Sequence, residues 1–128
     1  MNIIKNRKKS KNVEGLEVIE LDTFKDFRGE IWTVYSEEYS DLKFVADKIT
    51  VSTFGVLRGF HGDKHTAKLI TCLSGQMQFA VVDLQYKGPE GQVTISWDDP
   101  DINVKWTIQN PILSERDKKG VSYKGIYL

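Results

Sequence analysis

The feature that most constrains the fold is a series of short runs in which side chains alternate in character. Apolar, aromatic and β-branched residues recur with a period near two in residues 30–36, 48–60, 75–84, 91–97 and 102–108. Successive side chains of a β-strand point to opposite faces, so this period predicts strands, and the glycines between the runs predict turns. The only helix signal is the weak capping-box spacing of Ser114 and Asp117, which predicts a short turn. Many short strands predict an all-β sandwich or barrel.

The bulk properties are those of a single soluble domain covering residues 1–128. Eighteen basic and eighteen acidic residues balance, so no net field attracts nucleic acid or an anionic membrane. The single cysteine, Cys72, excludes an internal disulfide and fits a reducing cytoplasm. No signal peptide or membrane-length apolar run is evident. Residues 1–14 are basic and predict a solvated arm, with a phosphate- or nucleic-acid-binding tail as the alternative.

Both histidines of the chain, His61 and His65, lie in one stretch, "VLRGFHGDKHTAKLI". Three interpretations compete: a metal site, a catalytic base in a polar pocket, and an exposed loop. Glycines at 59 and 62 oppose a helix, and on a strand the two histidines would be roughly 13 Å apart. Metal–nitrogen bonds are only about 2.1 Å long, so a shared ion would require a tight loop. We therefore predict neither a metal nor a cofactor.

A catalytic base is better supported by the composition of the stretch. Imidazole titrates near neutral pH and contributes roughly 10²–10⁴-fold as a base. Removing a proton beside a ketone also requires a donor to the enolate oxygen, for which Lys68 is a candidate. Arg58 is a candidate phosphate ligand. From spacing alone, both side chains are equally compatible with ordinary exposure.

Six motifs occur in the order expected of one known family. They are "DFRG" (26–29), "FVADKITVSTFGVLRGFH" (44–61), "KLI" (68–70), "VVDL" (81–84), "WDDPD" (97–101) and "PILSERD" (111–117). Together they resemble the dTDP-4-dehydrorhamnose 3,5-epimerase family over residues 15–120. The resemblance implies a cupin-type jelly-roll β-barrel, a homodimer, and a nucleotide-linked 4-keto-6-deoxyhexose as substrate, without metal or redox cofactor.

The resemblance also implies roles for individual residues. His61 matches the family's base, Asp117 the carboxylate that orients it, and Lys68 the lysine at the enolate oxygen. Arg28 and Arg58 match arginines that contact the nucleotide phosphates. The implied activity is epimerisation at C3, C5 or both, in the biosynthesis of deoxysugars for surface polysaccharides such as lipopolysaccharide.

The chain departs from the family pattern in several places. Ala46 and Thr33 replace a glutamine and a glutamate, and the segment between His61 and Lys68 is short. After Leu84 the strands that carry the family's acid tyrosine are missing, so the barrel is expected to be shortened. Tyr86 is the candidate for that acid. The alternatives are a non-catalytic cupin that binds a sugar nucleotide or a partner protein, and a deletion product of a larger enzyme.

Overall fold

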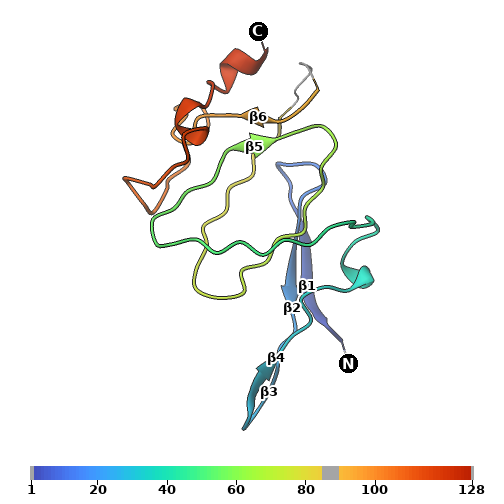
Figure 1. The fold of residues 1–128 in the computed structure, drawn as a ribbon. Helices are drawn as coiled ribbons and strands as arrows, with labels where there is room; N and C mark the ends of the chain where they lie inside the picture. The colour runs from blue at the N-terminus through green and yellow to red at the C-terminus, as the bar shows by residue number, and fades with distance from the viewer. Residues whose placement is uncertain (1, 85–89, 128) are drawn as a thin grey trace. The chain divides into compact units, whose positions relative to one another are not determined.

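The computed structural model describes residues 2–84 and 90–127, and its regular structure consists of β-strands and short 3₁₀-helices (Figure 1). The strands form three two-stranded antiparallel sheets, and no closed barrel is present among these residues. The predicted all-β class is confirmed. None of the described helices is long and apolar enough to span a membrane. Contacts divide the chain into two compact units, Met1–Asp47 and Lys48–Leu128, and each is described by itself.

The first unit consists of two hairpins and a helical turn. Strands β1 (Ile4–Lys9) and β2 (Glu17–Leu21) pair, as do β3 (Phe24–Asp26) and β4 (Gly29–Ile31). The 3₁₀-helix η1 (Glu37–Tyr39) follows. Six of the fourteen residues expected to form a solvated arm are therefore strand β1, because their backbone pairs with β2.

Arg7 holds this first unit together. Its guanidinium bonds Glu17 on β2 at 2.7 Å and the carbonyl oxygens of Glu38 and Tyr39 at 2.8 and 3.0 Å. Tyr39 is only 2% exposed, and its hydroxyl donates to the Thr33 carbonyl at 2.6 Å. Arg7, a basic residue of the N-terminal segment, therefore stabilises the fold of the first unit.

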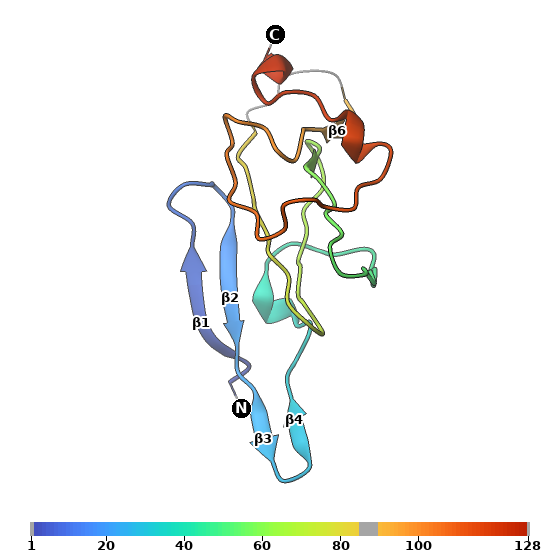
Figure 2. The same ribbon diagram turned by 90° about the vertical axis from the view of Figure 1, so that its left-hand side faces the viewer.

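The second unit is built around β6 and the residues that follow it. Strand β5 (His61–Gly62) pairs with β6 (Val93–Thr94). The short helices η2 (Asp117–Lys119) and η3 (Lys124–Tyr127) come from the C-terminal part, which runs beside β6 in both ribbon views (Figures 1 and 2). Ile95, 4% exposed, exchanges two backbone bonds with Phe60 at 2.9 and 3.0 Å. Val121 bonds the backbones of Thr94 and Ser96 at 3.0 and 2.9 Å.

Several expected strands are absent from the sheets. Residues 48–60, 75–84 and 102–108 form no named strand, β4 covers only the start of 30–36, and β6 only part of 91–97. An extended segment becomes a strand only when a neighbour pairs its N–H and C=O groups. Apolar side chains consequently stay exposed, Phe54 by 95% and Val51 by 88%. The accessible surface is 10802 Å², whereas two separate compact units of these sizes would expose roughly 8,300 Å².

Gly120 provides a test of the packing behind β6. A Cβ atom at this position would lie 2.6 Å from the Ser96 nitrogen and 2.7 Å from the Ile95 carbonyl carbon. The φ angle of Gly120 is −57°, so space and not backbone angle requires glycine. We expect Gly120→Ala to lower the free energy of unfolding by about 1–3 kcal/mol in urea titrations. Gly62→Ala, where the nearest atoms are at 3.9 and 4.0 Å, is the control, and equal losses in both variants would contradict this explanation.

Candidate active site

His61 and Asp117 lie within hydrogen-bonding distance, although 56 positions separate them in sequence. The His61 Nε2 atom is 2.5 Å from the Asp117 Oδ1 atom. The imidazole is 24% exposed, whereas the Asp117 side chain is only 3% exposed. A buried carboxylate is costly unless it is hydrogen-bonded or paired, so this bond and those around it matter to the fold as well as to the site.

Two sets of hydrogen bonds hold Asp117 in place, one at its backbone and one at its carboxylate. The Ser114 Oγ atom accepts a bond from the Asp117 N–H at 3.1 Å, and the Ser114 carbonyl accepts from Lys118 N–H at 3.1 Å. The helical turn predicted at Ser114 is therefore confirmed. The Gly59 N–H donates to the other carboxylate oxygen, Oδ2, at 3.3 Å. Asp117 thus bonds the His61 side chain and the backbone N–H of Gly59, two residues before His61.

This geometry determines which nitrogen of His61 is available. An ionised carboxylate can only accept hydrogen bonds, so a neutral imidazole bonded to it carries its proton on Nε2. The Nδ1 atom then keeps its lone pair and can accept a proton. The pair has the form of a base and an orienting carboxylate.

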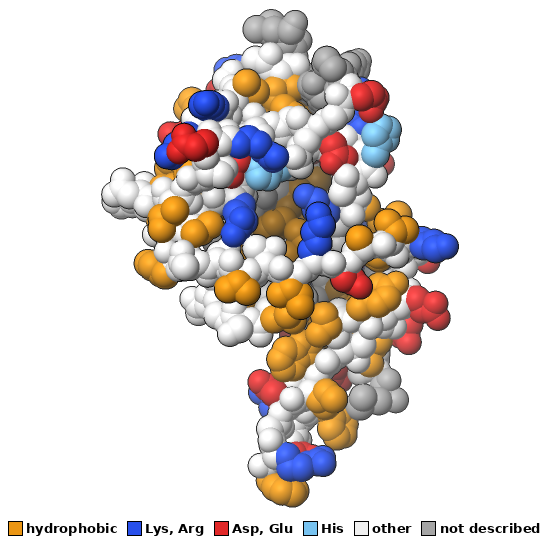
Figure 3. Space-filling view, in the orientation of Figure 1, with side chains coloured by type: hydrophobic (Ala, Val, Ile, Leu, Met, Phe, Trp, Pro, Cys, Tyr) orange, Lys and Arg blue, Asp and Glu red, His pale blue; other side chains and the backbone are white. Residues whose placement is uncertain are grey.

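His65 belongs to a different cluster. Its Nε2 atom is 2.6 Å from Glu90 Oε2, and the side chains are 76% and 68% exposed. The two histidines also lie apart on the molecular face in Figure 3, one in a recess flanked by basic side chains. In the part of the chain that the structure describes, no three His, Cys, Asp or Glu side chains are grouped to hold a metal ion.

The other expected site residues make contacts of their own. Lys68 is exposed after β5. The pKa of Asp63 is lowered first by a hydrogen bond from the Thr66 side chain, and the Lys68 charge adds a smaller effect in the same direction. The Arg58 Nε atom donates to Ser52 Oγ at 3.1 Å. Arg28, in the first unit, bonds Asp26 and so lowers the pKa of that carboxyl. Tyr86 lies outside the described residues.

Asp99 is a buried carboxylate that the sequence did not single out. It is 3% exposed and accepts three backbone hydrogen bonds, from Tyr123 at 2.8 Å, Asp101 at 2.9 Å and Ile102 at 3.2 Å. Within "WDDPD" it resembles any turn aspartate, because the Tyr123 donor arrives 24 positions later. Only the three-dimensional fold distinguishes it from Asp98.

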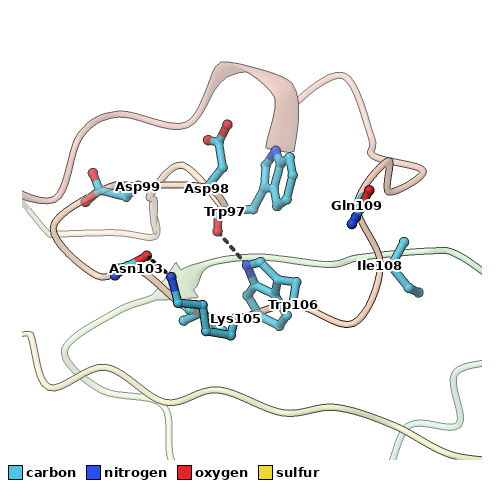
Figure 4. Close-up of a pocket in the computed structure, with 9 residues that line it drawn as sticks. Trp97, Asp98, Asp99, Asn103, Lys105, Trp106, Ile108 and Gln109 are labelled. Carbon is cyan, nitrogen blue, oxygen red and sulfur yellow. Dashed lines mark hydrogen bonds between the residues drawn. The ribbon is translucent and has the colours of Figure 1, made fainter.

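Asp99 also borders an open hollow of about 350 Å³ (Figure 4). Trp97 and Trp106 lie on opposite sides of it, joined by a bond from Trp106 Nε1 to the Trp97 carbonyl at 2.8 Å. The Trp106 ring is 5.8 Å from that of Phe60, next to His61. None of the predicted catalytic residues that the structure describes (His61, Lys68 and Asp117) lines this hollow, so it is distinct from the His61–Asp117 pair.

The ionisation of Asp99 should make stability depend on pH. The hydrogen bond from Tyr123, helped by those from Asp101 and Ile102 and by Lys124, holds the pKa of Asp99 below its ordinary value of 3.8, although burial opposes this. A lowered pKa stabilises the fold above the unfolded-state pKa, and the contribution is lost as pH falls through the folded-state pKa. We expect Asp99→Asn to be less stable than wild type at neutral pH, by a margin that shrinks below pH 3.8. Urea unfolding at several pH values measures this margin, and a constant margin would contradict the assignment.

Comparison with known proteins identifies the family. The dTDP-4-dehydrorhamnose 3,5-epimerase family matches residues 10–91, which include His61, Lys68, Arg28 and Arg58. Proteins named dTDP-4-dehydrorhamnose 3,5-epimerase from Shigella flexneri and Methanothermobacter thermautotrophicus are both 24% identical to this chain. The alignment covers 96% of this chain and 96% of the Shigella protein, and 84% of this chain and 89% of the Methanothermobacter protein.

The alignment also measures the shortening. The alignment with the Shigella protein is 179 positions long, whereas this chain has only 128 residues. At least 51 positions of the alignment therefore have no counterpart in this chain. The match to the family nevertheless covers well over half of the chain. The protein is a divergent, shortened member of the dTDP-4-dehydrorhamnose 3,5-epimerase family.

Proposed function

We propose that the protein epimerises a nucleotide-linked 4-keto-6-deoxyhexose at C3, C5 or both, in the cytoplasm, for the synthesis of deoxysugars of surface polysaccharides. The observation that carries the proposal is the 2.5 Å contact between His61 and the buried Asp117. A histidine with one nitrogen bonded to an orienting carboxylate is suited to removing a proton at neutral pH. Membership of the family supplies the reaction class.

In the proposed reaction His61 Nδ1 removes a proton from the carbon beside the ketone. The electron pair of the broken C–H bond moves into the enolate, and the imidazolium that forms is stabilised by Asp117. Return of a proton to the opposite face restores the ketone with inverted configuration. No electrons are gained or lost overall, so the reaction needs no redox partner.

The remaining residues have proposed roles in binding and charge stabilisation. Lys68 would donate to the enolate oxygen, where one well-placed donor contributes roughly 3–4 kcal/mol. Arg58 and Arg28 would bind the phosphates. Tyr86 is the candidate acid on the opposite face, and solvent water would supply the proton without it.

Deuterium incorporation tests the proposed chemistry. The protein is incubated in D₂O with a dTDP-4-keto-6-deoxyhexose, and incorporation at C3 and C5 is followed by NMR. We expect His61→Asn to reduce the rate by about 10²–10⁴-fold because the base is lost. Asp117→Asn should also reduce it, since the amide would no longer orient the same tautomer.

His65→Asn is the matched control, because it removes the exposed imidazole that bonds Glu90. Equal rates for the His61 and His65 variants would refute the role of His61. The missing positions favour the alternative of a non-catalytic binding module. Calorimetric binding of the sugar nucleotide without deuterium exchange would support that module, and no binding would reject both functions.

We also propose a homodimer. Exposed apolar residues on the unpaired segment 48–54 support it, because large apolar surfaces of soluble proteins are usually covered by a partner. Light scattering should give twice the chain mass of 14.7 kDa. Val51→Glu should weaken the dimer, whereas Gln92→Glu, at an exposed polar position, should not. A monomer at all concentrations would contradict this proposal.

A further inference from the structure

His61 and the residues that follow Asp117 are both hydrogen-bonded to the segment 93–99. His61 pairs with Thr94 on β6, and the neighbouring Phe60 exchanges two backbone bonds with Ile95. On the other side, Val121 bonds the backbones of Thr94 and Ser96. The segment 93–99 therefore holds, through backbone hydrogen bonds, both the strand that carries His61 and the residues that follow Asp117.

The Asp99 side chain extends this attachment toward the C-terminus. Its Oδ2 atom accepts from the Tyr123 N–H at 2.8 Å, while Oδ1 accepts from Asp101 and Ile102. These bonds tie the loop after β6 to residue 123 through a carboxylate that is 3% exposed. Lys124, which bonds Asp101 at 3.0 Å, is the neighbouring cation, and Asp98 bonds the Ser96 hydroxyl at 2.6 Å.

Little chain separates this attachment from the candidate site. Helix η2 contains only Asp117–Lys119, and Gly120 follows directly, with its backbone against Ser96. A shift of residues 120–123 away from β6 would therefore act on η2 and lengthen the contact between Asp117 and His61. Without the bond between Asp99 and Tyr123, residues 120–123 would be held to β6 only by the backbone bonds of Val121 and could rotate about that residue.

We propose that Asp99 is a positioning residue for the His61–Asp117 pair. By fixing Tyr123 to the loop after β6, it holds η2 at the distance at which Asp117 bonds the imidazole. It touches neither His61 nor substrate and acts only through the backbone between residues 117 and 123. Its effect on catalysis rests on the proposed function, whereas its effect on the hydrogen bond does not.

NMR of the free protein tests the hydrogen bond without any substrate. An imidazole N–H held by a carboxylate gives a downfield proton signal that exchanges slowly with water, and nitrogen-15 labelling of histidine separates His61 from the exposed His65. We expect Asp99→Asn to weaken the His61 signal or speed its exchange by at least about tenfold, since an amide cannot accept all three N–H bonds. The His65 signal should not change.

Asp98→Asn is the matched control, because it makes the same chemical change at an exposed neighbour that bonds only Ser96 in the described contacts. An unchanged His61 signal in Asp99→Asn, or an equal change in Asp98→Asn, would overturn the proposal. If deuterium incorporation is measurable, its kcat should fall by about tenfold or more in Asp99→Asn, with little change in KM. Activity that is absent even in wild type would reject the proposed function alone.

Hydrogen exchange in the wild-type protein gives a second test, which does not depend on the folding of a variant. If Asp99 holds the pair together, the Tyr123 amide and the His61 imidazole N–H should become exposed in the same opening event, with opening free energies that agree. Exchange of the Tyr123 amide while the His61 proton stays protected would overturn the proposal.

Discussion

The candidate site depends on the burial of one carboxylate. Asp117 is almost inaccessible to solvent, so its charge must be compensated by groups that the fold brings to it. The chain provides the His61 imidazole and the Gly59 N–H to the carboxylate, while the Ser114 hydroxyl accepts a bond from the backbone N–H of Asp117. Chemistry and stability therefore rest on the same contacts, and a substitution that unpairs Asp117 would affect both.

Two runs with the composition of strands lie outside the sheets of this chain. Residues 48–60 and 75–84 have the alternating composition of strands but form no named strand among residues 2–84 and 90–127. The first segment pairs only locally, through a bridge between Val56 and Ile112 and the two bonds between Phe60 and Ile95. In the comparison with the Shigella protein, at least 51 positions have no counterpart in this chain. In place of a backbone ladder, the side chain of Gln78 bonds the Lys105 and Thr107 backbones at 2.9 Å.

The sequence predicted the all-β class because a period of two requires only local information. It did not predict which runs would pair. The alternation of side chains shows which face of a strand each residue occupies, but it does not show which other strand lies beside it. The link between His61 and Asp117 followed from family resemblance, because no local pattern joins residues 56 positions apart. No local pattern marks Asp99 either, because its Tyr123 donor lies 24 positions away, whereas the Ser114 turn, a contact within three positions, was predicted correctly.

The sequence separation within the His61–Asp117 pair also bears on how the protein is made. β5 leaves the ribosome long before η2, so the imidazole is synthesised well ahead of the carboxylate that it contacts. Closing a loop of this length has an entropic cost that is recovered only when the 117–123 segment docks beside β6. The pair consequently cannot form until both segments have been synthesised, which makes its assembly a late event while the chain leaves the ribosome.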